Sequence, residues 1–279
     1  MKKRLTLTIN QELSKNILKV KTDVLVVGVN EDKALNPLSQ KIDNATNGII
    51  KKLIKRKEFE GKIGQTAYIS TSEGTSADRI FLVGFGKASN NLNSDNIDKI
   101  SSAITGCLTS KQSVNGSVCI PSVKFESKEL KDSDLLQKLG TSIESKTYTY
   151  DAKLNKKNKK VNHLKKVSIF VDSKQSNTQL RKGLKTGQAI GQGMNEAKDL
   201  ANLPGNICTP SYLASSSRAA AKKYPNLSCR VFGEKEMKKM GMDCLLSVGN
   251  GSAQESKLIS MNYQGGKKDE RPYAIVGKG

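Results

Sequence analysis

The sequence predicts an α/β protein in which a three-layer domain is followed by the beginning of a second α/β domain. Residues 1–174 alternate short apolar runs with amphipathic stretches, a pattern typical of helices packed against a sheet in layers. A long helical pattern then covers 175–203, and a new alternation of helices and strands starts at 204. We therefore expect an N-terminal domain at 1–174, an interdomain helix at 175–203 and an incomplete second domain at 204–279.

The strands of the first domain are indicated by short apolar runs. At the start of the chain Leu5, Leu7 and Ile9 alternate with polar residues, which predicts a strand and not the unbroken apolar stretch of a signal peptide. The longest clean apolar run is VLVVGV at 24–29, far short of the roughly 18 residues of a membrane span. Further strands are expected at 66–71, 78–87, 116–122 and 165–172.

Amphipathic segments between these runs predict the helices. We expect one helix over 39–56, a second near 95–109 and a third near 132–143. The lysine-rich stretch at 151–166 lacks apolar periodicity and is therefore expected to be an exposed loop.

The interdomain helix has glycines at a regular spacing. Gly183, Gly187 and Gly191 fall four residues apart on one stripe, although each glycine costs about 1 kcal/mol relative to alanine inside a helix. Close approach of another backbone or domain would explain the three glycines, and a frayed or broken helix is the alternative.

The second domain begins with clear stop and start signals. LPGN at 203–206 ends the long helix, and Thr209 as N-cap with Pro210 at the first position starts another. A strand in LSCRVFG, a helix in EKEMKKMGM closed by Gly241 and a strand in KLISMNYQG are expected next. Tyr273 to Val276 then predict a short buried strand, after which the chain stops at Gly277, Lys278 and Gly279, as if interrupted.

Composition restricts the chemistry that the chain can perform. Five cysteines, none in a C-x-x-C pair, argue against a disulfide framework and against a thiolate zinc site. The single histidine, His163, has no partner for a catalytic triad or a His-rich metal site. Any metal would have to be held by carboxylates, carbonyls or an unusual lysine.

The net charge of +21 raises the possibility of nucleic-acid binding, because basic side chains neutralise phosphates. Only seven of the 47 basic residues are arginine, whereas readout of base edges favours bidentate arginine. The lysines are also scattered along the chain. This pattern favours a solvated basic surface and leaves a nucleic-acid site as the alternative.

Two glycine-rich segments could be mistaken for nucleotide-binding loops. Gly249 to Ser252 lacks the spacing of a phosphate-binding G-x-x-x-x-G-K-[ST] loop, so a turn is expected there. VGFGK at 83–87 lacks the third glycine of the dinucleotide fingerprint and is expected to be a strand followed by a turn.

Several longer segments together carry a resemblance to a known family. They are NEAKDLANLPGNICTPSYLA at 195–214, EMKKMGMDCLLSVGNGS at 236–252, KLISMNYQGG at 257–266 and PYAIVGKG at 272–279. In order and separation they resemble the front half of the catalytic domain of the leucyl aminopeptidase family, also called cytosol aminopeptidases or peptidase family M17. DRIFLVGFGK at 78–87 is similar to the N-terminal, macro-domain-like module of that family.

The resemblance implies a cytoplasmic metalloexopeptidase that removes N-terminal residues from peptides, with leucine preferred. It implies two divalent cations, usually Zn²⁺ or Mn²⁺, and a homohexamer. In the family the strand ending V-G-K-G delivers a metal-binding lysine, and Lys278 matches that position. The family's next elements, T-F-D, a second catalytic lysine and N-T-D-A-E-G-R with further metal carboxylates, have no counterpart in this sequence, so the chain resembles an aminopeptidase cut off at its first metal ligand.

Two hypotheses follow from these observations. The first is a leucyl aminopeptidase-type enzyme represented by an incomplete chain, which is inactive alone and holds its two cations poorly. The second is a non-enzymatic basic module whose N-terminal domain binds nucleic acid or a nucleotide. No catalytic or substrate-binding residue is assigned in either hypothesis, and Lys278 is the single candidate metal ligand.

Overall fold

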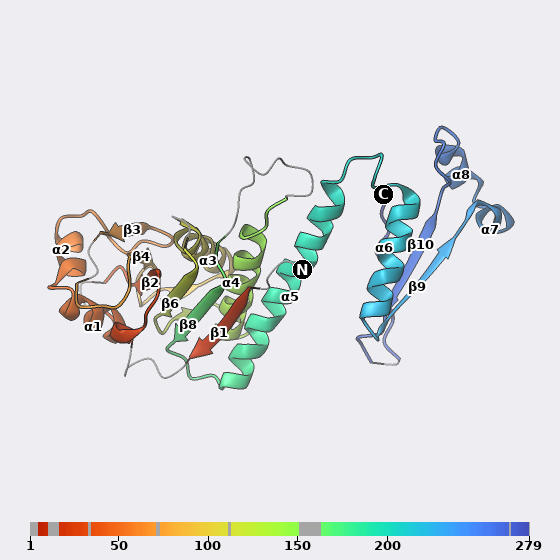
Figure 1. Ribbon diagram of the computed structural model, residues 1–279. Helices are drawn as coiled ribbons and strands as arrows, with labels where there is room; N and C mark the ends of the chain where they lie inside the picture. Colours follow the sequence, from red (N-terminus) through yellow and green to blue (C-terminus); the bar gives the residue numbers. More distant parts are fainter. Residues whose placement is uncertain are drawn as a thin grey trace. The chain divides into compact units, whose positions relative to one another are not determined.

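A six-stranded sheet forms the centre of residues 1–198 in the computed structural model, which describes residues 5–10, 17–32, 35–70, 73–110, 113–150, 163–267 and 269–278 (Figure 1). Its strands are β1 (Thr6–Asn10), β2 (Val24–Val29), β3 (Thr66–Ile69), β4 (Ile80–Gly84), β6 (Asn115–Ile120) and β8 (Lys166–Val171). They lie in the order β1-β8-β6-β2-β4-β3, and every neighbouring pair is parallel except β3 and β4. The six strands expected from the sequence are thus confirmed. Two short strands, β5 (Asn91–Leu92) and β7 (Lys124–Phe125), pair separately.

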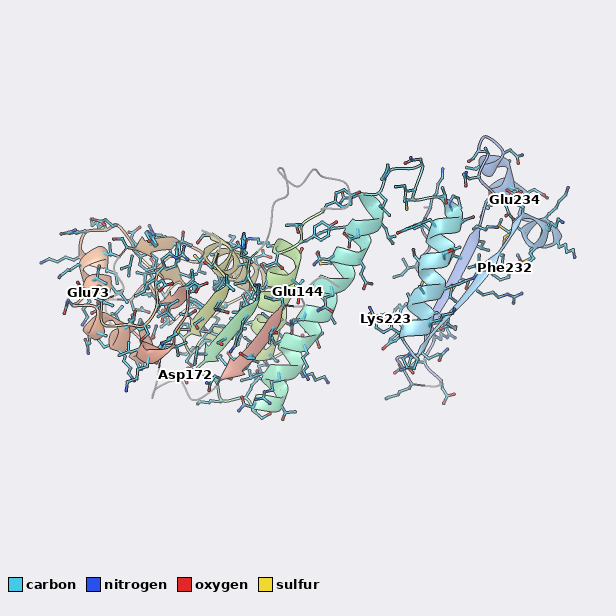
Figure 2. The ribbon with its side chains drawn as sticks, in the orientation of Figure 1. Glu73, Glu144, Asp172, Lys223, Phe232 and Glu234 are labelled. Carbon is cyan, nitrogen blue, oxygen red and sulfur yellow. The ribbon has the colours of Figure 1, made fainter. Side chains whose placement is uncertain are left out.

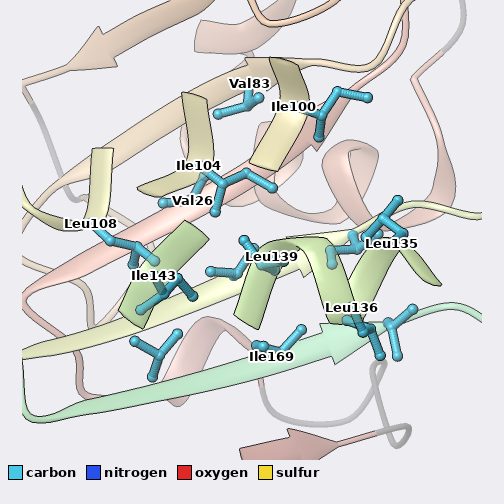
Figure 3. Close-up of a cluster of buried hydrophobic side chains, with 14 of the residues drawn as sticks. Val26, Val83, Ile100, Ile104, Leu108, Leu135, Leu136, Leu139, Ile143 and Ile169 are labelled. Carbon is cyan, nitrogen blue, oxygen red and sulfur yellow. The ribbon is translucent and has the colours of Figure 1, made fainter. Parts of the chain in front are cut away.

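Helices cover both faces of this sheet, so that the α/β fold has three layers. Val24 and Val26 of β2 pack on one face against α3 (Ser94–Leu108) and α4 (Asp132–Lys146), as the close-up in Figure 3 shows for Val26. Leu25 and Val27 point to the other face, in a cluster with residues of η1 (Ile17–Lys19), α1 (Pro37–Ala45) and α2 (Ile49–Lys55). Alternate residues of one strand therefore supply both halves of the core.

The prediction of a single helix over 39–56 is wrong, because the chain breaks between α1 and α2. Asn47 and Gly48 have φ of 55° and 73°, a left-handed conformation that ends a helix. The buried carboxylate of Asp43 then accepts a hydrogen bond from the Lys51 amide at 3.1 Å, in the first turn of α2. Asp43 thus binds a free amide at the start of the second helix.

The long helix α5 (Asn177–Ala201) is continuous and packs closely against α4. A Cβ atom added to Gly183 or Gly187 would overlap with the backbone carbonyl groups of Ser133 or Gln137, respectively. A Cβ on Gly191 would meet the Cβ of Glu144. The expected close approach of another backbone is confirmed, and the alternative of a frayed helix is excluded.

Residues 199–279 form a smaller unit. It contains α6 (Pro210–Lys223), β9 (Leu227–Phe232), α7 (Glu234–Lys239), α8 (Asp243–Gly249) and β10 (Leu258–Tyr263). Strands β9 and β10 pair antiparallel, and α6 packs along them (Figure 1). The Thr209 side chain accepts a hydrogen bond from the Tyr212 amide at 3.2 Å, which confirms the predicted N-cap. The helix α8 was not expected from the sequence.

The prediction of a buried strand at 273–276 is wrong. This segment has no regular secondary structure, and Tyr273, Ile275 and Val276 are 100%, 97% and 94% exposed. A strand forms only when a neighbouring strand binds its backbone groups, and in the described part of the smaller unit β9 and β10 pair with each other. The segment 273–276 pairs with neither of these strands, so its apolar residues stay exposed.

Two further findings concern the chain outside these elements. Most of the loop expected at 151–166 lies outside the described residues, which resume at His163. In the described part of the chain, no helix combines the length and the apolar character needed to cross a membrane.

Limited proteolysis tests the extent of the N-terminal domain. We expect a protected fragment beginning near residue 5. The sequence places its end near 174, whereas the burial of Leu180 and Leu184 in the core extends it into α5, toward Lys198. Mass spectrometry of the fragment measures this limit, and digestion throughout 17–171 without a protected fragment would contradict an autonomous domain.

Candidate active-site segment

Lys278, the candidate metal ligand, lies in the irregular segment 271–278 of the smaller unit. Its side chain is exposed, as are its apolar neighbours Ile275 and Val276. The nearest structured elements in the chain are β10 and the turn in which the Lys267 amide donates to the Glu270 carboxylate at 3.1 Å. Lys278 is therefore available for a ligand, but no element described here fixes its position.

The best-placed carboxylates of this unit serve local structure. Glu236 accepts a hydrogen bond from the Gly233 amide at 3.2 Å and caps the start of α7. Glu234 accepts from the Ser256 amide at 2.8 Å and ties α7 to the segment before β10. Glu255 forms an ion pair with Lys257 at 2.5 Å. These acidic groups thus stabilise the start of α7 and its contact with the segment before β10.

Electrostatics agrees with this structural role. The hydrogen bond from Lys257 lowers the pKa of the Glu255 carboxyl, and the bond from the Glu234 amide acts in the same direction. Glu255 is half exposed, so this ion pair is screened by solvent and adds little stability.

The resemblance implies two cations, and their requirements differ from the donors that the described residues offer. A pair of divalent cations needs several carboxylate or similar ligands, with shared groups that bring the ions about 3.5 to 4 Å apart. Within the described ranges, no group of three or more His, Cys, Asp or Glu side chains lies close enough to hold a metal ion. Lys278 offers one nitrogen. The described donors therefore do not fit a two-cation site.

The two glycine-rich segments adopt the conformations expected from the sequence. After β4, Gly86 has φ of 73°, its carbonyl accepts from the Glu31 amide at 2.8 Å, and the Asp32 carboxylate accepts from the Ala88 amide at 2.7 Å. These bonds tie the segment after β4 to the segment after β2, and the turn itself begins at Lys87, whose carbonyl accepts from the Asn90 amide at 3.0 Å. Gly249 ends α8, and its carbonyl accepts from the Ser252 amide at 3.0 Å, which also forms a turn.

A polar contact that sequence analysis missed joins α4 to α5. Glu144, labelled in Figure 2, is a buried residue that is only 7% exposed. Its carboxylate accepts a hydrogen bond from the side-chain amide of Gln188 at 3.1 Å. Asn195 and Lys198 of α5 bind the last turn of α4. The signal in the sequence is a polar stripe on α5 that continues the line of the glycines, but its partner cannot be known before α4 and α5 are placed together.

Comparisons with known proteins agree with this α/β architecture and its succession of two units. Residues 26–157 match the model of the cytosol aminopeptidase family, N-terminal domain, and residues 195–279 match that of the family's catalytic domain. The two matches follow one another in the family's own order. The chain therefore belongs to the cytosol aminopeptidase family.

Individual relatives extend this finding. The chain is 34% identical over 261 residues to a probable cytosol aminopeptidase of Nitrosococcus oceani, covering 94% of this chain and 52% of the relative. It is 32% identical over 262 residues to the cytosol aminopeptidase of Pseudomonas aeruginosa, covering 93% and 52%. The chain thus spans about half the length of these curated relatives.

Solved structures show the same fold. A tomato leucine aminopeptidase variant matches with a TM-score of 0.77 at 21% identity, over 96% of this chain and 52% of that one. The bottromycin maturation enzyme BotP, in complex with Mn, matches with a TM-score of 0.62 at 18% identity, over 86% and 44%. At these identities the likeness concerns the fold alone.

Proposed function

We propose that residues 1–279 supply the N-terminal domain and the front part of the catalytic domain of a leucyl aminopeptidase-type exopeptidase. The whole protein would release N-terminal amino acids from peptides in the cytoplasm. The observation that carries this proposal is the match of one chain to both family models in the correct order, at 26–157 and 195–279. The relatives, named as cytosol aminopeptidases, support the substrate class and the location.

The proposal includes two divalent cations, Mn²⁺ or Zn²⁺, with Lys278 as the residue that this chain contributes to their site. A related fold has been solved in complex with Mn, which supports the choice of metal. Oxygen ligands favour Mn²⁺, and a lysine can bind a metal only when its amine is deprotonated. Because the described donors do not fit a cation pair, residues 1–279 alone are proposed to be inactive. By resemblance, the active form is a homohexamer.

A chimera tests this function. Residues 1–279 are joined to the second half of the Nitrosococcus oceani relative and, separately, to that of the Pseudomonas aeruginosa relative. We expect at least one folded chimera to hydrolyse leucine p-nitroanilide and to lose this activity to a chelator. Circular dichroism and gel filtration show whether each chimera has folded. Two folded chimeras without aminopeptidase activity would contradict the proposal.

The alternative function, nucleic-acid binding, is supported by the net charge of +21. We expect residues 1–279 to bind a DNA duplex weakly, with no sequence preference, and to release it between about 50 and 200 mM salt, since counterion release alone drives such binding. Fluorescence anisotropy with two unrelated duplexes measures the affinity and its dependence on sequence and salt. Tight binding that survives physiological salt and distinguishes the duplexes would favour the non-enzymatic module.

A further inference from the structure

We propose that Asn195 and Lys198 of α5 form a latch on the carboxyl end of α4, so that α5 moves as one body with the N-terminal unit and the chain pivots after the helix ends at Ala201. In the family comparison the catalytic-domain match already begins at Asn195. The structure assigns this first turn of the match to the N-terminal unit instead, because the side chains of Asn195 and Lys198 in this turn bind α4. The inference depends on contacts within residues 1–198 and not on the proposed activity.

The latch satisfies carbonyl groups that every helix leaves free at its end. The Ile143 carbonyl still accepts from the Thr147 amide at 3.0 Å, so the carbonyls beyond the regular hydrogen-bond pattern of α4 begin at Glu144, whose carbonyl also accepts from Thr147 Oγ1 at 3.0 Å. The side-chain amide of Asn195 donates to the Glu144 carbonyl at 2.9 Å, and Lys198 Nζ donates to the Ser145 carbonyl at 3.2 Å. Two side chains three residues apart on α5 therefore cap α4 from outside.

The charge of Lys198 suits this position. Its ammonium group lies at the negative end of the α4 dipole, where a cation is stabilising. Nζ also donates to Ser145 Oγ at 2.7 Å and lies 5.3 Å from the centre of the Tyr148 ring, within the range of a cation–π interaction. Asn195 Oδ1 accepts a further bond from Nζ at 3.5 Å and joins the two latch residues.

The latch completes a contact that runs along α5. The glycines at 183, 187 and 191 bring the backbones together, and Gln188 and Gln192 donate to the Glu144 carboxylate at 3.1 and 3.4 Å. Lys198 is the last residue of this series and also the last residue of the N-terminal unit.

The segment after the latch is built differently. Residues 202–209 lie outside the helices and strands and are exposed or half-buried, and their backbone includes short-range bonds such as Ile207 N to the Pro204 carbonyl at 2.8 Å. Pro204 and Gly205 interrupt the helical pattern there. A stretch with local bonds and little burial opens at low cost, which makes it the place where a change of direction is absorbed.

Hydrogen exchange on the whole 279-residue chain tests the latch. We expect wild-type peptides covering 142–148 and 188–198 to exchange about tenfold more slowly than those covering 202–209. In the double variant Asn195→Leu/Lys198→Met, exchange at 142–148 and 192–198 should rise about tenfold, while β2 and β6 keep their protection. Lys185→Met, an exposed position on α5, should change neither region.

Two results would overturn the proposal. One is wild-type exchange at 188–198 as fast as at 202–209. The other is unchanged exchange at 142–148 and 192–198 in a folded double variant. If the double variant loses protection in β2 and β6, its fold is disturbed, and the single variants Lys198→Met and Lys198→Arg then test the latch. The arginine of Lys198→Arg can still donate to the Ser145 carbonyl, so this variant should exchange more slowly at 142–148 than Lys198→Met. Equal exchange in the two variants would contradict the latch.

Discussion

Replacing Gly187 by alanine is expected to destabilise the N-terminal unit by about 2 to 3 kcal/mol and to lower its Tm by about 5 to 10 °C. The added methyl group would overlap with the backbone carbonyl of Gln137, and neither backbone can move without disturbing the whole contact between α4 and α5. Urea unfolding followed by circular dichroism measures the change in the free energy of unfolding.

Gly193 provides the matched control on the same helix. A Cβ atom there has no heavy atom within 4 Å, so Gly193→Ala should raise the stability by up to about 1 kcal/mol through helix propensity. If both substitutions have the same effect, the close packing of α5 on α4 does not govern stability, and the account of the glycine stripe is wrong.

Replacing Lys278 by alanine in an active chimera is expected to lower kcat/KM by about 100-fold or more, because the proposed metal ligand is lost. Residues 1–279 alone should show the same background with and without the substitution. The assay is hydrolysis of leucine p-nitroanilide at saturating Mn²⁺.

The control is Lys239→Ala on α7, another exposed lysine of the smaller unit, which should leave kcat/KM unchanged. Full activity of the Lys278→Ala chimera would remove Lys278 from the metal site and leave the chain without an assigned ligand.

The strands of the sheet could be predicted because each is a short run of β-branched or aliphatic residues, as in β2 and β8. The break at Asn47 and Gly48 was missed because the apolar spacing continues across it from Ile42 to Ile50, although Asn-Gly is a turn signal. Periodicity reports which residues are buried, and one helix or two can bury the same residues.

The site could be predicted only in part. An apolar run such as 273–276 specifies a tendency to form a strand, whereas a strand needs a partner that the local sequence does not name. The same holds for Lys278, whose role depends on ligands brought by other segments. The latch residues Asn195 and Lys198 were invisible for a similar reason, since their partners on α4 lie about 50 residues earlier in the chain.

Metal binding by residues 1–279 tests the central claim most directly, namely that this chain contributes Lys278 to a two-cation aminopeptidase site that its described donors do not complete. Equilibrium dialysis against micromolar Mn²⁺ should find no stoichiometric binding to residues 1–279 and two ions per chain in a folded, active chimera. Two tightly bound ions on residues 1–279, together with chelator-sensitive hydrolysis of leucine p-nitroanilide, would show a complete site in this chain and contradict the account.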